Sequence, residues 1–255
     1  QDAGIKEINL IAQDVTAYGL DRGQNDALAD LLTDLLPLIP NVPWVRLLYT
    51  YPGMVSDRLI ELMAAKNQLI PYLDMPLQHA DPAVLKAMSR PSNVDWVTDT
   101  ITKMRKLIPN LVVRTTMIVG YPNETEQSFL ELCDFIIKTK FDHLGVFTYS
   151  SELDTNSFPL GDPIPAEVKE ARKAELMQIQ ADIAFHKLQK LRGQTLEMLV
   201  EGVNRDERLL VGRTYRDAPE IDGLTLASGV ASEGDMVSIR ITQTTEYDLI
   251  GEQIK

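Results

Sequence analysis

The sequence predicts an α/β protein in which a partial (β/α) barrel of parallel strands is followed by a small antiparallel β-barrel. Through the first 191 residues, apolar strand-like segments alternate with amphipathic helical segments, the order typical of a parallel sheet with crossover helices. A long helical segment then runs from 165 to about 192, and after it the helical period disappears. We therefore expect two domains, residues 1–191, which include the long helix as a linker, and residues 192–255.

The first domain is expected to hold strands at 5–12, 44–49, 72–79, 111–120 and 141–149. Helices are predicted over 26–38 and after the N-terminal cap residues Ser56, Asp81 and Ser92. Ser92 with Asp95 three residues later resembles a capping box. The segment 151–165 is rich in Pro, Gly, Asp and Ser, and its length predicts a loop that covers a functional site.

The second domain is expected to be built from short strands. Alternating apolar and polar residues occur at 195–201, 209–215, 235–242 and 247–251. Turn residues such as Asp222-Gly223 separate these segments. Short strands at such spacing are typical of a small antiparallel barrel.

Composition restricts the possible functions. The chain has 25 basic and 37 acidic residues, a net charge of −12, which argues against a broad surface for nucleic-acid phosphates and favours a basic partner or a small substrate. A single cysteine, Cys133, excludes a disulfide framework and a cysteine-ligated metal centre made by this chain alone. No apolar run reaches the roughly 18 residues that span a bilayer. We expect a soluble, cytoplasmic protein that does not bind membranes.

Polar residues gather where the predicted strands end. Because the carboxyl ends of parallel strands share one edge, such residues are expected to line one binding site. The candidates are Gln13 and Asp14, Thr50 and Tyr51, Gln78 and His79, Arg114 and Thr116, Glu124 after Gly120, and Tyr149 with Ser150.

Each candidate also has a structural interpretation. Asp14 fits a turn, and Arg114 fits an ion pair with Asp14 or Glu124. Glu124 also suits the start of a helix, where the helix dipole favours a carboxylate. His79 fits a buried, satisfied histidine beside a helix cap. Gly120 suits either a tight turn or the close approach of a ligand to the backbone.

The sequence contains no recognisable catalytic motif. There is no Gly-rich phosphate loop, no nucleophile elbow and no cluster of His or Cys with metal-ligand spacing. His143 and His186 fall on separate elements and are interpreted as structural or exposed. Cys133 lies among apolar helix residues and is interpreted as a small buried hydrophobe. The residues alone therefore predict a binding site without a catalytic residue or a metal ligand.

Several segments together resemble a known family, the radical S-adenosylmethionine methylthiotransferases. The segments are 8–19 (INLIAQDVTAYG), 46–52 (RLLYTYP), 72–80 (YLDMPLQHA), 85–91 (LKAMSRP), 114–126 (RTTMIVGYPNETE) and 145–151 (GVFTYSS). The residues in these segments are most similar to those of the type that modifies an aspartate of small-subunit ribosomal protein twelve. The sister type, which modifies an adenosine in tRNA, usually has Pro-Val-Gln-Ser-Gly where this chain has PLQHA at 76–80. Residues 193–251 resemble the TRAM domain that ends both enzymes.

The resemblance implies two kinds of cofactor, S-adenosylmethionine and two 4Fe–4S clusters. Family members hold the radical-generating cluster with a Cys-x-x-x-Cys-x-x-Cys loop, and a preceding domain carries three more cysteines; this chain has neither. We therefore expect a fragment, inactive alone and binding S-adenosylmethionine weakly at best, whose cluster ligands lie upstream of Gln1.

The resemblance also assigns expected roles by motif. Gln13 and Asp14 match positions near the methionyl end of S-adenosylmethionine, and Gln78 and His79 match ribose contacts. Arg114 and Thr116 would face its charged or ribose groups. Gly120 and Glu124 belong to the segment beside adenine, with the backbone around Tyr149 completing that edge.

Charge distinguishes the two sister substrates. Residues 192–255 contain 7 basic and 12 acidic residues, whereas a TRAM domain that binds tRNA should be basic. The leading hypothesis is an aspartate methylthiotransferase, expected to be a monomer, whose partner is a basic ribosomal protein. Two alternatives are a tRNA adenosine methylthiotransferase and a non-catalytic module that docks a basic protein.

Overall fold

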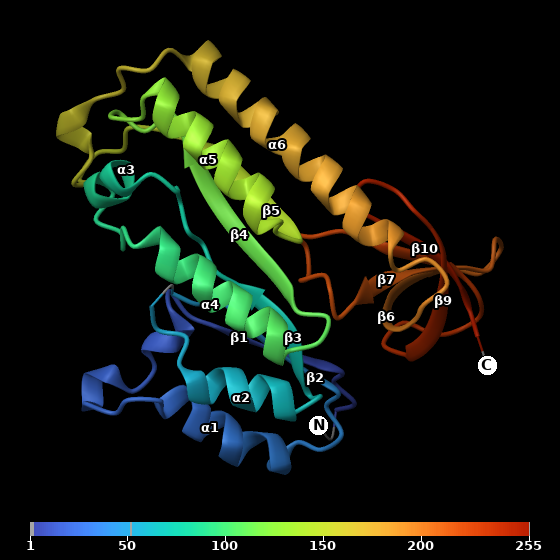
Figure 1. The fold of residues 1–255 in the computed structure, drawn as a ribbon. Coiled ribbons are helices and arrows are strands. Elements are labelled where there is room, and N and C mark those ends of the chain that lie inside the picture. The colour runs from blue at the N-terminus through green and yellow to red at the C-terminus, as the bar shows by residue number, and fades with distance from the viewer. Residues whose placement is uncertain (1–2, 52, 255) are drawn as a thin grey trace.

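The computed structural model describes residues 3–51 and 53–254, which form a sheet-and-helix domain and a small barrel joined by one long helix (Figure 1). Within these residues the first domain has a five-stranded parallel sheet whose strand order follows the chain. Its strands are β1 (Glu7–Ile11), β2 (Trp44–Leu48), β3 (Leu69–Asp74), β4 (Val112–Val119) and β5 (His143–Thr148). Sequential parallel strands joined by helices form a section of a (β/α) barrel, so the predicted fold class is confirmed.

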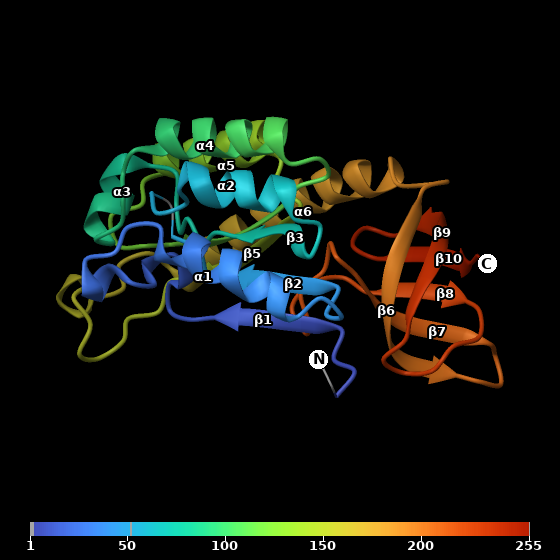
Figure 2. The ribbon, with the colours of Figure 1, turned by 90° about the horizontal axis from the view of Figure 1, so that it is seen from below.

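Helices cover one face of this sheet (Figure 2). They are α1 (Ala27–Leu35), α2 (Asp57–Ala65), α3 (Pro82–Ala87), α4 (Val94–Leu107), α5 (Glu126–Thr139) and α6 (Ala166–Gln189). Short 3-10 turns are η1 (Val15–Ala17), η2 (Leu20–Arg22), η3 (Leu36–Leu38) and η4 (Phe158–Leu160). The main core lies between sheet and helices and includes Leu32, Leu47, Ile60, Leu73, Ile101, Val113 and Leu132. Within the described residues, no helix combines the length and the apolar character needed to cross a bilayer.

The second domain is a closed barrel in the strand order β10-β8-β7-β6-β9. Its strands are β6 (Thr195–Asn204), β7 (Leu209–Thr214), β8 (Thr225–Ser228), β9 (Met236–Thr244) and β10 (Leu249–Gln253). Neighbouring strands are antiparallel as expected, except that β8 and β10 pair in parallel. The sequence did not predict β8, because four residues are too few to establish an alternating pattern.

Two local predictions differ from the structure. The strand expected at 72–79 ends at Asp74, although Gln78 still forms an isolated parallel bridge with Met117 of β4. The cap of α4 is Asn93, whose side chain accepts a hydrogen bond from the Trp96 amide (3.0 Å), and not Ser92. The domain boundary that we propose, between 191 and 192, falls between the end of α6 and the start of β6.

The barrel packs against the sheet face that the helices leave uncovered, at the amino ends of the strands (Figure 2). Glu7 of β1 accepts hydrogen bonds from Arg46 Nε of β2 and Arg213 Nη2 of β7, both at 2.7 Å. Tyr72 packs in a shared apolar cluster with Ala218. We call this half of the sheet face the closed end, and the half at the carboxyl ends of the strands the open end.

Candidate binding site

A cavity of about 430 Å³ lies at the open end of the sheet. Its lining combines residues that follow β1, β2 and β3, residues of β4 and β5, and one residue of the barrel domain. They are Gln13, Tyr49, Thr50, Tyr51, Pro76, Gln78, Arg90, Arg114, Thr116, Phe147 and Ile221. Four of the residues with assigned roles therefore meet there, namely Gln13, Gln78, Arg114 and Thr116. In parallel α/β proteins this edge is where ligands bind.

Two residues that line the cavity have the left-handed backbone conformation. Tyr49, directly after β2, has φ 59° and Gln78 has φ 67°. Gln78 is held beside β4 because its amide donates to the Thr116 carbonyl (2.9 Å) and its carbonyl accepts from the Ile118 amide (2.8 Å). Left-handed non-glycine residues cost free energy and often occur at functional sites. Their presence in the segments that follow the adjacent strands β2 and β3 supports a binding role for this edge.

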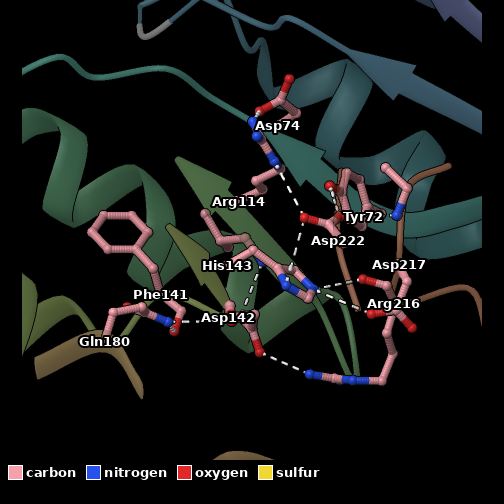
Figure 3. Close-up of polar contacts among 12 residues, drawn as sticks. Tyr72, Asp74, Arg114, Phe141, Asp142, His143, Gln180, Arg216, Asp217 and Asp222 are labelled. Carbon is pink, nitrogen blue, oxygen red and sulfur yellow. Dashed lines mark hydrogen bonds and ion pairs between the residues drawn. The ribbon is translucent and has the colours of Figure 1, made fainter. Parts of the chain in front are cut away.

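Among the site residues predicted from the sequence, Arg114 is the charged one that lines this cavity. Two carboxylates hold its guanidinium from two sides (Figure 3). Its Nη1 donates to Asp74 Oδ1 of β3 (2.9 Å), and its Nε lies 3.3 Å from Asp222 Oδ1 of the barrel domain. The prediction that Arg114 pairs with Asp14 or Glu124 is therefore wrong. The side chain is 14% exposed, so the guanidinium is fixed but still accessible from the cavity.

A second cavity of about 390 Å³ adjoins the first, since Gln78, Arg90 and Phe147 line both. Tyr149 lines it, with its ring in edge contact with the Tyr121 ring at a centroid distance of 5.0 Å. The loop predicted at 151–165 contributes Asn156 and Ser157. The open end therefore has room for an elongated ligand.

Three residues of the predicted set form a buried cluster and do not line either cavity. Glu124 Oε2 accepts from the Gly120 amide (2.7 Å), and its Oε1 accepts from Arg172 Nη1 of α6 (2.8 Å). His79 Nδ1 accepts from the Asp81 amide (2.9 Å), and its Nε2 lies 3.6 Å from Glu124 Oε2. At this distance Nε2 makes no hydrogen bond to the carboxylate, and it is a buried ring nitrogen without a hydrogen-bond partner among the described residues. The cluster fixes the turn at Gly120, where φ is 77°.

Asp14 lies beside the cavity and not in its lining. Its carboxylate accepts from the Thr16 amide (2.9 Å) and from the Thr16 hydroxyl, and so caps η1. The Thr16 hydroxyl in turn accepts from the amide of Tyr51, a lining residue (3.2 Å). The turn interpretation of Asp14 therefore describes its contacts, and it supports the cavity wall indirectly.

Sequence reasoning missed three functional candidates, Asp74, Asp222 and Ile221. Asp74 Oδ2 also accepts from the Tyr49 amide (3.1 Å), so this buried carboxylate joins β2, β3 and β4. The sequence feature that could have identified Asp74 is an acidic residue within an apolar strand segment. Asp222 and Ile221 lie in a turn of another domain, and no local pattern connects them with this site.

The described residues do not fit an iron–sulfur cluster. Cys133 is buried on α5, and burial raises its pKa to about 11, which disfavours the thiolate that binds metals. No group of three or more His, Cys, Asp or Glu side chains in the described part of the chain has a metal-binding arrangement. The cavity residues do fit a polar organic ligand, because amide, hydroxyl and guanidinium groups converge there on an apolar wall that includes Phe147.

The parallel barrel section with its ligand cavity and the closed five-stranded barrel define a two-domain class. A family model described as the radical SAM superfamily matches residues 1–136, and one described as the TRAM domain matches residues 193–254. The chain belongs to the radical SAM superfamily and carries a TRAM domain.

The relatives define the type more closely. The chain is 44% identical, over its whole length, to ribosomal protein uS12 methylthiotransferase RimO of Roseiflexus sp. (strain RS-1), of which it covers 54%. It is 45% identical over 98% of its length to the protein of the same name from Syntrophotalea carbinolica, of which it covers 55%. The chain thus spans about half the length of these relatives.

Among solved structures, the chain is similar in fold to coproporphyrinogen III oxidase (HemN) of Escherichia coli, which is described as a radical SAM enzyme. The TM-score is 0.52 at 16% identity, covering 63% of this chain and 38% of that one. This likeness supports the fold alone.

Proposed function

We propose that the chain is part of a methylthiotransferase that adds a methylthio group to the β-carbon of an aspartate in ribosomal protein uS12. The observation that carries this proposal is the identity of 44% over the whole chain to a protein named ribosomal protein uS12 methylthiotransferase RimO. The aspartate β-carbon as the modified atom is what the resemblance of the sequence motifs implies. The acidic barrel domain supports a basic ribosomal protein as the substrate, because it would repel tRNA phosphates. Such a protein works in the cytoplasm.

Within this proposal the open end binds S-adenosylmethionine. Gln13, Gln78, Arg114 and Thr116 supply amide, guanidinium and hydroxyl groups for its charged and ribose groups. Tyr149 lines the adjoining cavity, which suits the adenine. Asp14, His79 and Glu124 act through their contacts with η1 and the Gly120 turn, which hold the walls in place.

The bound cofactors supply a strong oxidant for an unreactive C–H bond, together with a methyl group. The described residues contribute binding and orientation only, because they offer no ligand set for either of the two 4Fe–4S clusters. We therefore infer that this piece alone is inactive. The other half of the protein would bring the cluster ligands.

The test is genetic and uses the whole protein. Deleting the gene should remove the methylthio group from the uS12 aspartate, as measured by mass spectrometry of ribosomal proteins, and the wild-type gene should restore it. An Arg114→Met allele should restore little of the modification. If uS12 is unchanged on deletion while a methylthio group disappears from tRNA, the substrate assignment is wrong.

A further inference from the structure

The cavity at the open end is not built by the radical SAM domain alone. Ile221 and Asp222 belong to the β7–β8 connection of the TRAM domain, residues 215–224, which we call the interdomain loop. Ile221 lines the cavity and is 50% exposed. The Asp222 side chain is 2% exposed and lies against Arg114 (Figure 3).

Asp222 is fixed by more than one contact. Its Oδ2 accepts from the Tyr72 hydroxyl (2.5 Å) and from the Ala218 amide (2.9 Å). Its Oδ1 faces Arg114 Nε at 3.3 Å and His143 Nδ1 at 3.6 Å. Burial and the nearby Asp222 carboxylate raise the pKa of Tyr72 well above its usual range, so this phenol stays a donor. The carboxylate is therefore a rigid anchor.

The anchor determines which part of Arg114 remains available. Asp222 faces Nε, and Asp74 accepts from Nη1, which also lies 3.5 Å from the Thr116 hydroxyl. Among the described residues, no hydrogen bond or ion pair engages Nη2. A guanidinium held at both Nε and Nη1 presents its remaining N–H groups in a fixed direction, which favours binding of a carboxylate or hydroxyl oxygen.

We propose that Asp222 is a positioning residue for the cavity, so that the TRAM domain directs Arg114 toward the ligand in addition to any role in substrate docking. The identification of the ligand as S-adenosylmethionine or its product rests on the proposed function. The orientation of Arg114 by Asp222 does not depend on that assignment. Without Asp222, the guanidinium of Arg114 would keep its hydrogen bond to Asp74 and could rotate about that contact.

The matched control lies in the same interdomain loop. Asp217 is also buried, and its carboxylate contacts Thr214 (3.1 Å) and His143 (3.7 Å) without any contact to Arg114. Asp222→Asn and Asp217→Asn therefore remove comparable carboxylates from one segment, and only the first changes the environment of Arg114. Thermal unfolding of both variants serves as the check that each is folded.

The first measurement needs no ligand. The rate at which 4-hydroxyphenylglyoxal modifies Arg114, followed by peptide mass spectrometry on the whole protein, should increase severalfold in Asp222→Asn and stay at the wild-type rate in Asp217→Asn. Equal rates in wild type and Asp222→Asn would overturn the proposal. Equal acceleration in both variants would also overturn it, because it would show a general loosening of the domain interface.

The second measurement is calorimetric binding of S-adenosylhomocysteine to the whole protein. Asp222→Asn should weaken it about tenfold, the usual scale for one contact to a charged group. Asp222→Asn should add no further loss in an Arg114→Ala background, whereas an independent structural effect would add to it. Ile221→Ala, at an exposed position, should weaken binding only a few-fold. If the wild type does not bind this nucleoside, the proposed function fails, and the modification rates still decide the inference.

Discussion

The two ends of one sheet face differ in how their charges are used. At the closed end, Glu7 joins Arg46 and Arg213, all at most 5% exposed, and the barrel excludes water from them. At the open end, Gln13, Gln78 and Thr116 line a cavity, and Arg114 keeps part of its guanidinium available. The same parallel strands thus supply an interface at their amino ends and a binding site at their carboxyl ends.

The difference follows from the geometry of parallel strands. At the amino ends, side chains on the uncovered face meet a second domain, so each charge must be paired to offset its desolvation. At the carboxyl ends the chain leaves the sheet, and the left-handed residues Tyr49 and Gln78 redirect it around a cavity. Substitutions at the closed end should therefore alter stability, whereas those at the open end should alter binding.

The largest effect is expected from Glu7→Gln at the closed end. Removing this charge leaves Arg46 and Arg213 buried without their shared counter-ion, which should lower the free energy of unfolding by about 3 to 5 kcal/mol. Urea denaturation measures it. Asp30→Asn, which breaks an ion pair with Arg58 between half-exposed side chains, should cost less than about 1 kcal/mol. Equal costs would remove the distinction between buried and exposed pairs.

The interdomain loop should make stability depend on pH. Burial raises the pKa of Asp217 from 3.8 to about 6, although the charges of His143 and Arg216 oppose this and Asp222 reinforces it. At a pH between these two pKa values, Asp217 keeps a proton in the folded protein that it releases in the unfolded chain. The free energy of unfolding therefore falls as pH rises from about 4 to 6. The loss approaches about 3 kcal/mol, at 1.36 kcal/mol per pKa unit.

The measurement is denaturant unfolding across this pH range. The asparagine in Asp217→Asn cannot ionise, so the free energy of unfolding of this variant should not decline between pH 4 and 6. At pH 7 the variant should be more stable than the wild type. Parallel pH profiles for the two proteins would show that Asp217 ionises normally in the folded state.

A smaller effect is expected at the turn that supports the open end. In Gly120→Ala, a new Cβ would lie 2.1 Å from Lys169 Cγ of α6 at a backbone φ of 77°, so unfolding should become easier by about 1 to 3 kcal/mol. Thermal unfolding measures it. In Gly145→Ala the new Cβ meets its nearest side-chain atom at 3.7 Å, an ordinary contact, so this variant is the control.

The smallest effect on stability is expected from Thr116→Val in the cavity itself. The change conserves shape and removes a hydroxyl that has only a 3.5 Å contact with Arg114, so stability should change by no more than about 0.5 kcal/mol. Affinity for S-adenosylhomocysteine should nevertheless fall severalfold by calorimetry. A large loss of stability with unchanged affinity would place Thr116 with the structural residues of the closed end.

The sequence predicted the first domain well because most of its strands are largely apolar segments flanked by turn residues, which are easy to distinguish from amphipathic helices. It also predicted that Gln13, Gln78, Arg114 and Thr116 would meet, since parallel strands end at one edge. Adjacent residues can still separate there, as at Gln78, which lines the cavity, and His79, which is buried below it.

What the sequence could not predict depends on contacts between distant segments. In the sequence, Asp222 and Gly223 form an ordinary Asp-Gly turn motif. Only the docking of the two domains brings Asp222 into contact with Arg114. The partners of Arg114 were mistaken for the same reason, because Asp14 and Glu124 already bond to backbone amides near them in the chain. Sequence patterns report local structure, whereas this ion pair is tertiary.

The most direct measurement is a crystal structure of the whole protein with S-adenosylhomocysteine. We predict that the nucleoside occupies the cavity lined by Gln78 and Arg114, with an oxygen of the ligand on Arg114 Nη2 and Ile221 of the TRAM domain beneath it. A nucleoside bound elsewhere, such as in the groove beside β1 that Asn9 and Tyr18 line, would contradict the assignment of the open end as the cosubstrate site.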